Sequence, residues 1–214
     1  MSVGIHVIYL NMRHKKLTRE FFYQNTRETA KNLLGKVLVR KIDSRKSVDG
    51  ARDNHDKDLI CAMITETEAY CGPNDLASHA SKGKTPRTEV MFSKPGLIYV
   101  YMIYGMYYCL NIVTEKENYP AAVLIRGVQL IDPKLKFSEK SLLKNIDLGG
   151  PGKLCRYFKI DKSLNSQDLI GNRDLWIEDW GINIKQREII SGSRIGVDYA
   201  GKYKDKKWRY FIKL

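Results

Sequence analysis

Four runs of apolar and β-branched residues constrain the fold of this chain most strongly. They span Leu59–Ala69, Leu97–Ile103, Tyr108–Val113 and Ala121–Leu130, and short polar breaks separate the last three. Runs of this length between turn-forming residues are typical of strands. Strands and helical patterns do not alternate regularly, which argues against a parallel sheet built from βαβ units. We therefore predict an α+β fold, a curved, mostly antiparallel sheet forming a partly open barrel or roll with flanking helices.

Helical patterns and further strands flank these runs. A helix is expected from about residue 26, with Asn25 and Glu28 as a capping box and Gly35 as its stop. Within the first long run, alternation places Ile64, Glu66 and Glu68 on one face unless a bulge intervenes. The other expected elements are a helical turn at 21–22, strands at 36–42, 194–197 and 209–212, an exposed loop at 43–58, a loop with helical potential at 71–91, a helix after 149–152 and a short helix near 166–170.

The length of 214 residues is ample for one core, and neither a repeat nor a Pro-rich linker divides the chain. Hydrophobic residues at 43% and charged residues at 29% are typical of a globular protein. We expect a single domain over residues 17–214, preceded by a loose extension over residues 1–16.

The four cysteines and the N-terminal segment indicate the cellular compartment. Cys61, Cys71, Cys109 and Cys155 lie far apart without the CxxC spacing of zinc or redox sites, so we interpret them as reduced core residues. The apolar run in Met1–Leu10 lacks a preceding cationic segment, unlike a secretory signal, and no apolar stretch is long enough to span a bilayer. We expect no membrane partner and an intracellular location, the cytoplasm or nucleoid if the source is bacterial.

The charge balance points to a class of partner. The chain has 37 Lys and Arg residues against 24 Asp and Glu residues, a formal net charge of +13. A cationic surface displaces the counterions held by phosphates, so nucleic acid is the simplest partner. A solvated surface without a specific partner explains the charge equally well, and charge alone does not decide between them.

A carboxylate and a guanidinium fall within the apolar runs. Glu68 lies near the end of the first run, and Arg126 interrupts the last one. Because a buried cation needs an anionic partner, we expect Arg126 to be partly buried and paired with Glu68. A structural salt bridge at a strand end is the ordinary explanation. The catalytic alternative is that the two charges hold one water between them, with Glu68 kept ionised as a general base.

Aromatic residues crowd the segment 70–108 beside the basic segment Lys82–Arg87. The aromatic set is Tyr70, His79, Tyr99, Tyr101, Tyr104, Tyr107 and Tyr108. Aromatic faces next to cationic side chains suit unstacked bases and their phosphates. Tyrosine also packs well within sheets, and a single loop histidine is more often a local hydrogen-bonding residue than a catalyst. Base stacking and core packing therefore both remain open for these residues.

A glycine-rich segment precedes the expected helix near residue 152. Gly150–Lys153 offers backbone amides and a lysine to a phosphate. It lacks the GxxxxGK[ST] spacing of a nucleotide triphosphatase. The residues that we expect to contact a nucleic-acid backbone are Lys82, Lys84, Arg87 and Lys153.

Many short motifs follow one another in a specific order. They are Glu66–Tyr70, Asp75–His79, Thr85–Arg87, Met91–Phe92, Lys94–Gly96, Tyr99–Tyr101, Tyr104–Met106, Asn111, Leu124–Arg126, Gly150–Leu154 and Arg194–Val197. In this order they resemble the alkyladenine (3-methyladenine, methylpurine) DNA glycosylase family. The resemblance spans most of the chain from about Phe21, whereas residues 1–16 and 43–58 have no counterpart.

The resemblance implies a monofunctional enzyme that flips a damaged purine nucleotide out of double-stranded DNA and hydrolyses its N-glycosidic bond. It implies no metal, no cofactor and no covalent lysine intermediate, and we expect a monomer. By matching position, Glu68 activates the water and Arg126 helps to hold it, while Tyr104 fills the gap left in the helix. The resemblance assigns the base pocket to Tyr70, His79, Tyr101 and Asn111, of which Asn111 helps to reject the exocyclic amine of guanine.

The chemistry of alkylated purines agrees with these roles. Alkylation at N3 or N7 makes the purine cationic and weakens its bond to the sugar, so one general base can suffice. Electron-rich rings favour a cationic base by about 0.5–2 kcal/mol, and flipping a poorly stacked lesion costs on the order of a few kcal/mol. Two other classes stay open, a noncatalytic nucleic-acid-binding protein on the same scaffold and a hydrolase of free nucleosides.

Overall fold

Ten strands form one sheet in the computed structural model, which describes residues 14–42, 58–132, 142–143 and 146–213. The strands are β1 (Lys15–Lys16), β2 (Val37–Ile42), β3 (Asp58–Cys71), β4 (Ile98–Ile103), β5 (Tyr107–Val113), β6 (Ala121–Ile131), β7 (Leu148–Gly149), β8 (Leu175–Asp179), β9 (Ile190–Gly192) and β10 (Arg209–Phe211). The main path runs β1-β8-β2-β3-β6-β5-β4 with antiparallel pairing throughout. The sheet is open, because β1 and β4 end this path. The predicted α+β fold and antiparallel sheet are confirmed.

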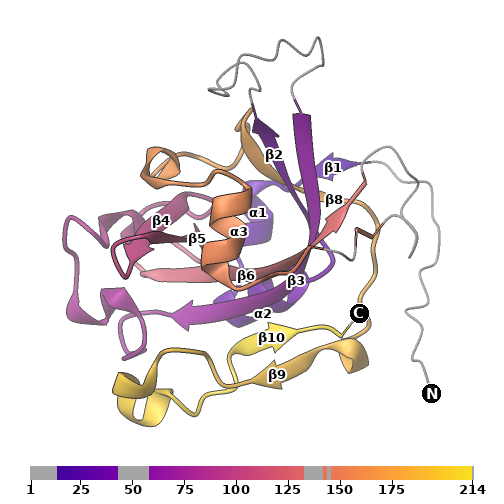
Figure 1. Ribbon diagram of the computed structural model, residues 1–214. Coiled ribbons are helices and arrows are strands. Elements are labelled where there is room, and N and C mark those ends of the chain that lie inside the picture. Colours follow the sequence, from indigo (N-terminus) through magenta and orange to yellow (C-terminus); the bar gives the residue numbers. More distant parts are fainter. Residues whose placement is uncertain (1–13, 43–57, 133–141, 144–145, 214) are drawn as a thin grey trace.

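Short helices flank the sheet (Figure 1). They are α1 (Arg19–Phe22), α2 (Thr26–Asn32) and α3 (Pro151–Tyr157), with 3-10 segments η2 (His79–Lys82), η3 (Glu89–Phe92), η5 (Lys162–Leu164), η6 (Gln186–Glu188) and η7 (Asp198–Tyr203). The helix α2 packs against β3 and β6, and α3 packs against β5 and β6. The strands β9 and β10 extend the sheet from β3, below it in the view of Figure 1. None of the helices in the described ranges has the length and apolar character needed to cross a bilayer.

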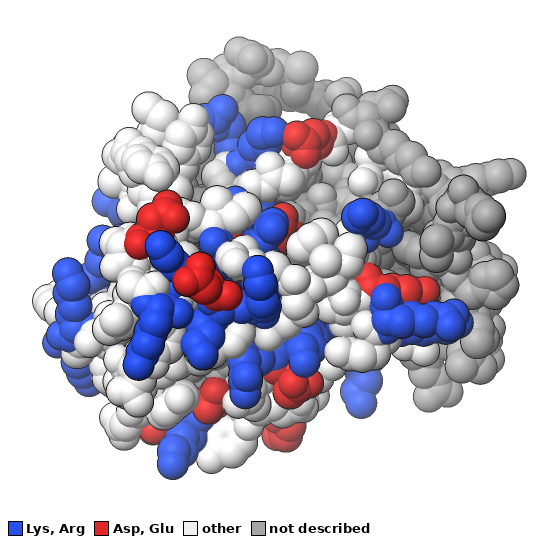
Figure 2. Space-filling view, turned by 90° about the horizontal axis from the view of Figure 1, so that it is seen from below, with Lys and Arg blue, Asp and Glu red and all other residues white. Residues whose placement is uncertain are grey.

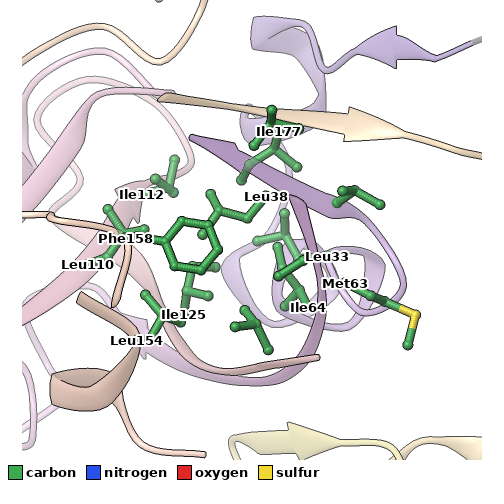
Figure 3. Packing of buried hydrophobic residues seen from close by; sticks show 14 of the residues in the cluster. Leu33, Leu38, Met63, Ile64, Leu110, Ile112, Ile125, Leu154, Phe158 and Ile177 are labelled. Carbon is green, nitrogen blue, oxygen red and sulfur yellow. The ribbon is translucent and has the colours of Figure 1, made fainter. Parts of the chain in front are cut away.

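Side chains from α2, α3 and eight of the ten strands meet in one core. Figure 3 shows Ile64 of β3 and Ile125 of β6 converging with Leu33, which follows α2, and with Phe158, which follows α3. All four side chains are fully buried. Burying a large apolar side chain contributes about 1.5–3 kcal/mol to folding. This core fixes the positions of β3 and β6, the two strands that carry Glu68 and Arg126.

The start of α2 confirms part of the predicted capping box. The Asn25 side chain accepts a hydrogen bond from the Arg27 amide, as an N-cap does. Glu28 instead pairs with Lys31 one turn further on, at 3.0 Å, so it is not the reciprocal partner that we predicted. The helix ends at Asn32 with Leu33 as its C-cap, two residues before the predicted stop at Gly35. Gly35 does have a left-handed φ of +83°, a conformation that favours glycine.

Several predicted elements lie elsewhere or have another form. Lys15 and Lys16 form β1 against β8, so the last two residues of the predicted extension join the sheet. The expected short helix near 166–170 is wrong: the helical turn is η5, where the Asp161 side chain caps the Ser163 amide. The expected strand at 194–197 is also wrong, because Gly196 has a φ of +75° and breaks the extended backbone after β9. Residues 1–13 and the predicted loop up to residue 57 lie outside the described residues.

The four cysteines agree with the interpretation of reduced residues. All of them are free thiols. Cys61, Cys109 and Cys155 are buried, and Cys71 is half-buried. The prediction of reduced core cysteines is therefore confirmed for these three. Cys71 packs against the core but is only partly buried.

Two bulges interrupt the pairing of β3 with β6. The paired residues along this stretch are Ile64 with Val128, Glu66 with Gly127, and Thr67 with Ile125. The register thus skips Thr65 on β3 and Arg126 on β6, which re-aims the side chains that follow. Ile64 joins the core, whereas Glu66 and Glu68 both reach Arg126. The predicted shared face is therefore right for the two carboxylates and wrong for Ile64.

Candidate active site

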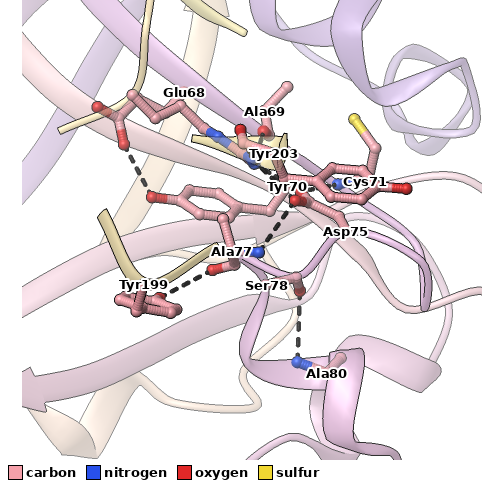
Figure 4. A network of polar contacts seen from close by, with 11 residues as sticks. Glu68, Ala69, Tyr70, Cys71, Asp75, Ala77, Ser78, Ala80, Tyr199 and Tyr203 are labelled. Atoms are coloured by element: carbon pink, nitrogen blue, oxygen red, sulfur yellow. Dashed lines mark hydrogen bonds and ion pairs between the residues drawn. The ribbon is translucent and has the colours of Figure 1, made fainter. Parts of the chain in front are cut away.

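The carboxylate of Glu68 is fully buried and lines a pocket of about 410 Å³. One oxygen, Oε1, accepts a hydrogen bond from the Ile195 amide at 3.0 Å. The other, Oε2, accepts a hydrogen bond from the Tyr70 hydroxyl at 2.8 Å (Figure 4). Arg126 Nε lies 3.6 Å from Oε1. The predicted pair of Glu68 and Arg126 is therefore present, and it is a direct ion pair.

A second carboxylate shares the Arg126 guanidinium. Arg126 Nε lies 3.2 Å from Glu66 Oε1, and the same oxygen lies 2.9 Å from Arg209 Nη1. Glu66 does not line the pocket, whereas Arg126 and Glu68 do. The sequence placed Glu66 on the face of Glu68 but did not indicate that it binds Arg126, and it did not indicate Arg209 as a member of this charge cluster.

The surroundings of Glu68 make it a stronger base than a glutamate in water. Burial raises its pKa, because desolvation penalises the charged carboxylate. The nearby Arg126 charge and the hydrogen bonds from the Ile195 amide and the Tyr70 hydroxyl lower the pKa, and the charge of Glu66 raises it. The net shift is upward. A buried carboxylate of this kind is suited to take a proton from a water molecule.

Aromatic rings form the wall of the pocket next to Glu68. The His79 and Tyr101 ring centroids lie 4.5 Å apart in an edge-to-face arrangement, and Tyr99 lies 5.2 Å from Tyr101. Tyr70 also lines the pocket. The arrangement places several aromatic rings around one cavity, which suits a planar heterocyclic ligand.

His79 is held as a neutral ring. Its Nδ1 lies 3.0 Å from the Tyr99 hydroxyl. Burial, together with the charge of Arg87, lowers its pKa from 6.5 to about 4. The imidazole therefore carries no charge at neutral pH.

Asn111 is fixed on β5 at the same pocket. Its side chain is buried, and its Nδ2 donates hydrogen bonds to the carbonyls of Tyr99 at 3.1 Å and Cys109 at 3.3 Å. These two bonds hold the amide in one orientation. Asn111 is therefore a rigid part of the pocket surface.

Tyr104 occupies the tip of the hairpin between β4 and β5. Its φ is +51° and that of Gly105 is +70°, and the Met106 amide bonds the Ile103 carbonyl at 3.2 Å. Two successive positive φ values are typical of a type I′ hairpin turn. The Tyr104 residue is 85% exposed and also lines the pocket. Its ring therefore projects into solvent at the mouth of the cavity.

The predicted backbone-contact residues are not equivalent in the structure. Lys82 and Lys84 are exposed. The Arg87 guanidinium lies 5.3 Å from the Tyr101 ring centre and lines the pocket, and Lys153 pairs with the exposed Asp147 at 2.6 Å. The face on the side of β9 and β10 carries many Lys and Arg side chains interspersed with fewer acidic ones (Figure 2). Among the described residues, no three His, Cys, Asp or Glu side chains are grouped as a metal site needs.

A family model described as methylpurine-DNA glycosylase (MPG) matches residues 20–214. The chain belongs to the methylpurine-DNA glycosylase family. A relative from Methanocella arvoryzae is 44% identical over 200 residues, which cover 92% of each chain. Relatives from Desulfitobacterium hafniense and Rickettsia felis are 41% and 42% identical over 92% of this chain, covering 95% and 92% of their own length. Each of the three carries the provisional name 3-methyladenine DNA glycosylase.

Membership of the methylpurine-DNA glycosylase family confirms the family resemblance and the enzyme class that the sequence indicated. The predicted residues that the structure brings to one pocket are Glu68, Tyr70, His79, Arg87, Tyr101, Tyr104, Asn111 and Arg126. Lys82, Lys84 and Lys153 do not line it. The sequence did not single out Ile195 or Tyr199, which line the pocket from the segment after β9. The motif Arg194–Val197 was the available signal for Ile195.

Proposed function

We propose that this protein is a monofunctional 3-methyladenine DNA glycosylase of base-excision repair. It flips alkylated or otherwise damaged purines out of double-stranded DNA, hydrolyses the N-glycosidic bond and leaves an abasic site. The proposed lesions are 3-methyladenine, 7-methylguanine, hypoxanthine and ethenoadenine. Family membership and the names of the relatives support the proposal. The observation that carries it is the fully buried Glu68 carboxylate, 3.6 Å from Arg126 at the side of a ring-lined pocket.

The proposed reaction uses water and one general base. Glu68 takes a proton from the water, the water oxygen bonds to C1′ of the sugar, and the bond from C1′ to the purine nitrogen breaks. The electron pair of that bond moves to the purine, which neutralises a cationic lesion such as 3-methyladenine. No proton is then needed by the leaving group. Glu68 ends the step protonated, and the Arg126 charge beside it helps to hold the water.

The pocket residues are proposed to select the base. Tyr70, His79 and Tyr101 stack around the flipped purine, and their rings favour a cationic base by about 0.5–2 kcal/mol. The rigid Asn111 amide excludes the exocyclic amine of guanine. Tyr104 enters the helix and replaces the flipped nucleotide. Easier extrusion of a poorly stacked lesion adds to the selection, since flipping costs on the order of a few kcal/mol.

The net charge of +13 supports binding of the DNA backbone without sequence preference. The exposed Lys82 and Lys84 are proposed to contact phosphates, together with Lys153 and Arg87, which flanks the pocket. We propose that a monomer performs the reaction without a cofactor. A hydrolase of free nucleosides has no use for such a surface.

Release of base from DNA tests the proposal. The substrate is a duplex with one 3-methyladenine, hypoxanthine or ethenoadenine, and the released base is measured. The wild-type protein is expected to release the base, and Glu68→Gln is expected to lower the single-turnover rate about 10²- to 10⁴-fold. The matched control is Glu28→Gln, which removes an exposed carboxylate that pairs with Lys31 and does not line the pocket. We expect this control to retain most of the release.

Each alternative class has its own outcome in this experiment. Binding of the damaged duplex by the wild-type protein without release of base indicates a noncatalytic binding protein. Release from free nucleosides and not from DNA indicates a nucleoside hydrolase. Full activity of Glu68→Gln contradicts the proposed general base.

A further inference from the structure

Arg194 and Asp75 form an ion pair in which both side chains are completely buried. Arg194 Nη1 lies 2.5 Å from Asp75 Oδ2, and Nη2 lies 2.8 Å from Oδ1, so the pair is bidentate. The same guanidinium donates hydrogen bonds to the carbonyls of Ala69 at 2.8 Å and Tyr203 at 3.3 Å. Arg194 thereby ties the segment after β9 to the end of β3.

The Asp75 carboxylate also organises the loop that leads to His79. It accepts hydrogen bonds from the Cys71 amide at 3.0 Å and the Ala77 amide at 3.2 Å (Figure 4). Ala77 and His79 both line the pocket. One carboxylate therefore joins Arg194 to the pocket wall.

Both hydrogen-bond donors to Glu68 are next to Arg194, one in space and one in the chain. The Arg194 guanidinium lies over the Tyr70 ring, 4.8 Å from its centre, and over the Trp208 ring at 5.0 Å. Tyr70 donates to Glu68 Oε2. The residue after Arg194 is Ile195, whose amide donates to Glu68 Oε1. The two oxygens of one carboxylate are thus bound by two groups that a single guanidinium holds in place.

The Arg194 guanidinium is kept in this position although one of its own polar atoms has no partner. Among the described residues, Arg194 Nε is the only buried side-chain nitrogen or oxygen without a hydrogen bond. A buried donor without a partner is unfavourable, so its retention calls for an explanation. The explanation we offer is that the guanidinium must pack against the Tyr70 ring while its own residue precedes Ile195 in the chain.

We propose that Arg194, locked by Asp75, is a positioning residue for the catalytic carboxylate. It fixes the Ile195 amide and the Tyr70 hydroxyl, which orient Glu68 and keep it ionised. This inference rests on the proposed role of Glu68 as the general base. Arg194 itself does not touch the reacting atoms; it acts through the two donors.

Loss of the two donors has a defined consequence for protonation. Burial raises the pKa of Glu68, and the Ile195 amide and the Tyr70 hydroxyl oppose that rise. Weaker hydrogen bonds therefore raise the pKa further, and Glu68 loses its charge at a higher pH. The titratable and charged groups that act on Glu68 are Arg126 of β6, Glu66 and Tyr70 of β3, Tyr101 of β4 and Cys109 of β5. Of these groups, only Tyr70, itself one of the two donors, contacts Arg194, so the shift reports on the two donors.

Single-turnover excision measured across pH tests the inference. The variants are Arg194→Lys and Asp75→Asn, and Tyr70→Phe removes one donor directly. We expect the acid limb of the rate profile to move upward by about one pH unit, the effect of one charge-assisted hydrogen bond, and the rate below the limb to fall about tenfold. The rate on the high-pH plateau is expected to fall less. Glu68→Gln, measured alongside, tests the proposed function separately, because it removes the limb and the activity together.

A merely structural ion pair gives a different result. Arg19→Lys is the matched control, because Arg19 pairs with Asp168 at 2.6 Å and does not line the pocket. This control is expected to leave the acid limb in place. An equal fold-loss at every pH in Arg194→Lys and Asp75→Asn, or an unmoved limb, overturns the inference while leaving the role of Glu68 intact.

Two further measurements cover variants that fail to fold. The double variant Asp75→Asn with Arg194→Gln replaces the charged pair by two amides that can still bond, and the same shift of the limb is expected. Hydrogen exchange in the wild-type protein needs no variant. The Ile195 amide is expected to exchange as slowly as the buried amides of β3, and rapid exchange overturns the inference.

Discussion

Replacing Tyr104 separates capture of a lesion from folding and from general DNA binding. The residue is 85% exposed, so Tyr104→Asn is expected to change the free energy of unfolding by less than about 0.5 kcal/mol. Asparagine tolerates the left-handed φ of +51° at this position. As the proposed wedge, the Tyr104 ring stacks on DNA only when a nucleotide has been flipped. Its loss removes about 1–3 kcal/mol of base stacking, which corresponds to a capture about 5- to 150-fold weaker.

The assay compares damaged and undamaged DNA. Single-turnover excision is measured against enzyme concentration on a duplex with one lesion, and binding of the undamaged duplex is measured over a range of salt. With Tyr104→Asn, the enzyme concentration that half-saturates excision of the lesion is expected to rise about 5- to 150-fold, the effect of losing one stacked base. Binding of undamaged DNA is expected to stay unchanged. Tyr23→Asn is the control, because Tyr23 is 61% exposed and does not line the pocket. Equal losses on both duplexes with Tyr104→Asn would refute the role as a wedge.

Three other outcomes follow from the same geometry. Asn111→Ser replaces the fixed amide by a smaller side chain and is expected to increase release of normal or mispaired guanine. Chromatography detects the free base, and no increase contradicts the proposed exclusion. Because the folded-state pKa of Glu68 is raised, its favourable contribution to stability is present below the unfolded pKa, about 4.3, and is lost as pH rises through the folded pKa. Glu68→Gln is therefore expected to have a larger free energy of unfolding than the wild type near neutral pH and to lose this advantage in acid. Urea unfolding of both proteins at the two pH values measures the difference. A difference of equal size at both pH values contradicts the raised pKa. Phe158→Ala empties a fully buried site and is expected to cost about 3–5 kcal/mol in the same assay, and a loss under about 1 kcal/mol means that the core near α3 is not packed as described.

The central strands could be predicted from the sequence because their signal is local. The run Tyr108–Val113 differs from β5 by one residue, and the run Ala121–Leu130 differs from β6 by one. The strand β8 gave no comparable signal, since its five residues include two acidic ones. It is a strand because β2 and β1 bond to its two edges, which are contacts between distant segments.

The part of the site that could be predicted from the sequence consists of charged residues that interrupt apolar runs. A charge inside an apolar run needs a partner, so Glu68 and Arg126 could be paired before the structure was known. The double bulge that brings Glu66 onto the same guanidinium depends on a shift of register between two strands, which alternation does not encode. The bonds from Ile195 to Glu68 and from Arg194 to Asp75 join residues 127 and 119 positions apart. No spacing rule reaches that far.

The neutral state of His79 fits the proposed cationic ligand. A protonated imidazole in the pocket would repel a positively charged purine, whereas a neutral ring stacks on it. Burial and Arg87 lower the pKa of His79 to about 4, so this ring stays neutral over the range in which the proposed base must work. His79 therefore contributes no step to the rate profile near neutral pH. An acid limb observed there belongs to Glu68, whose pKa burial raises, and the upward shift expected of Tyr70→Phe assigns it to that carboxylate.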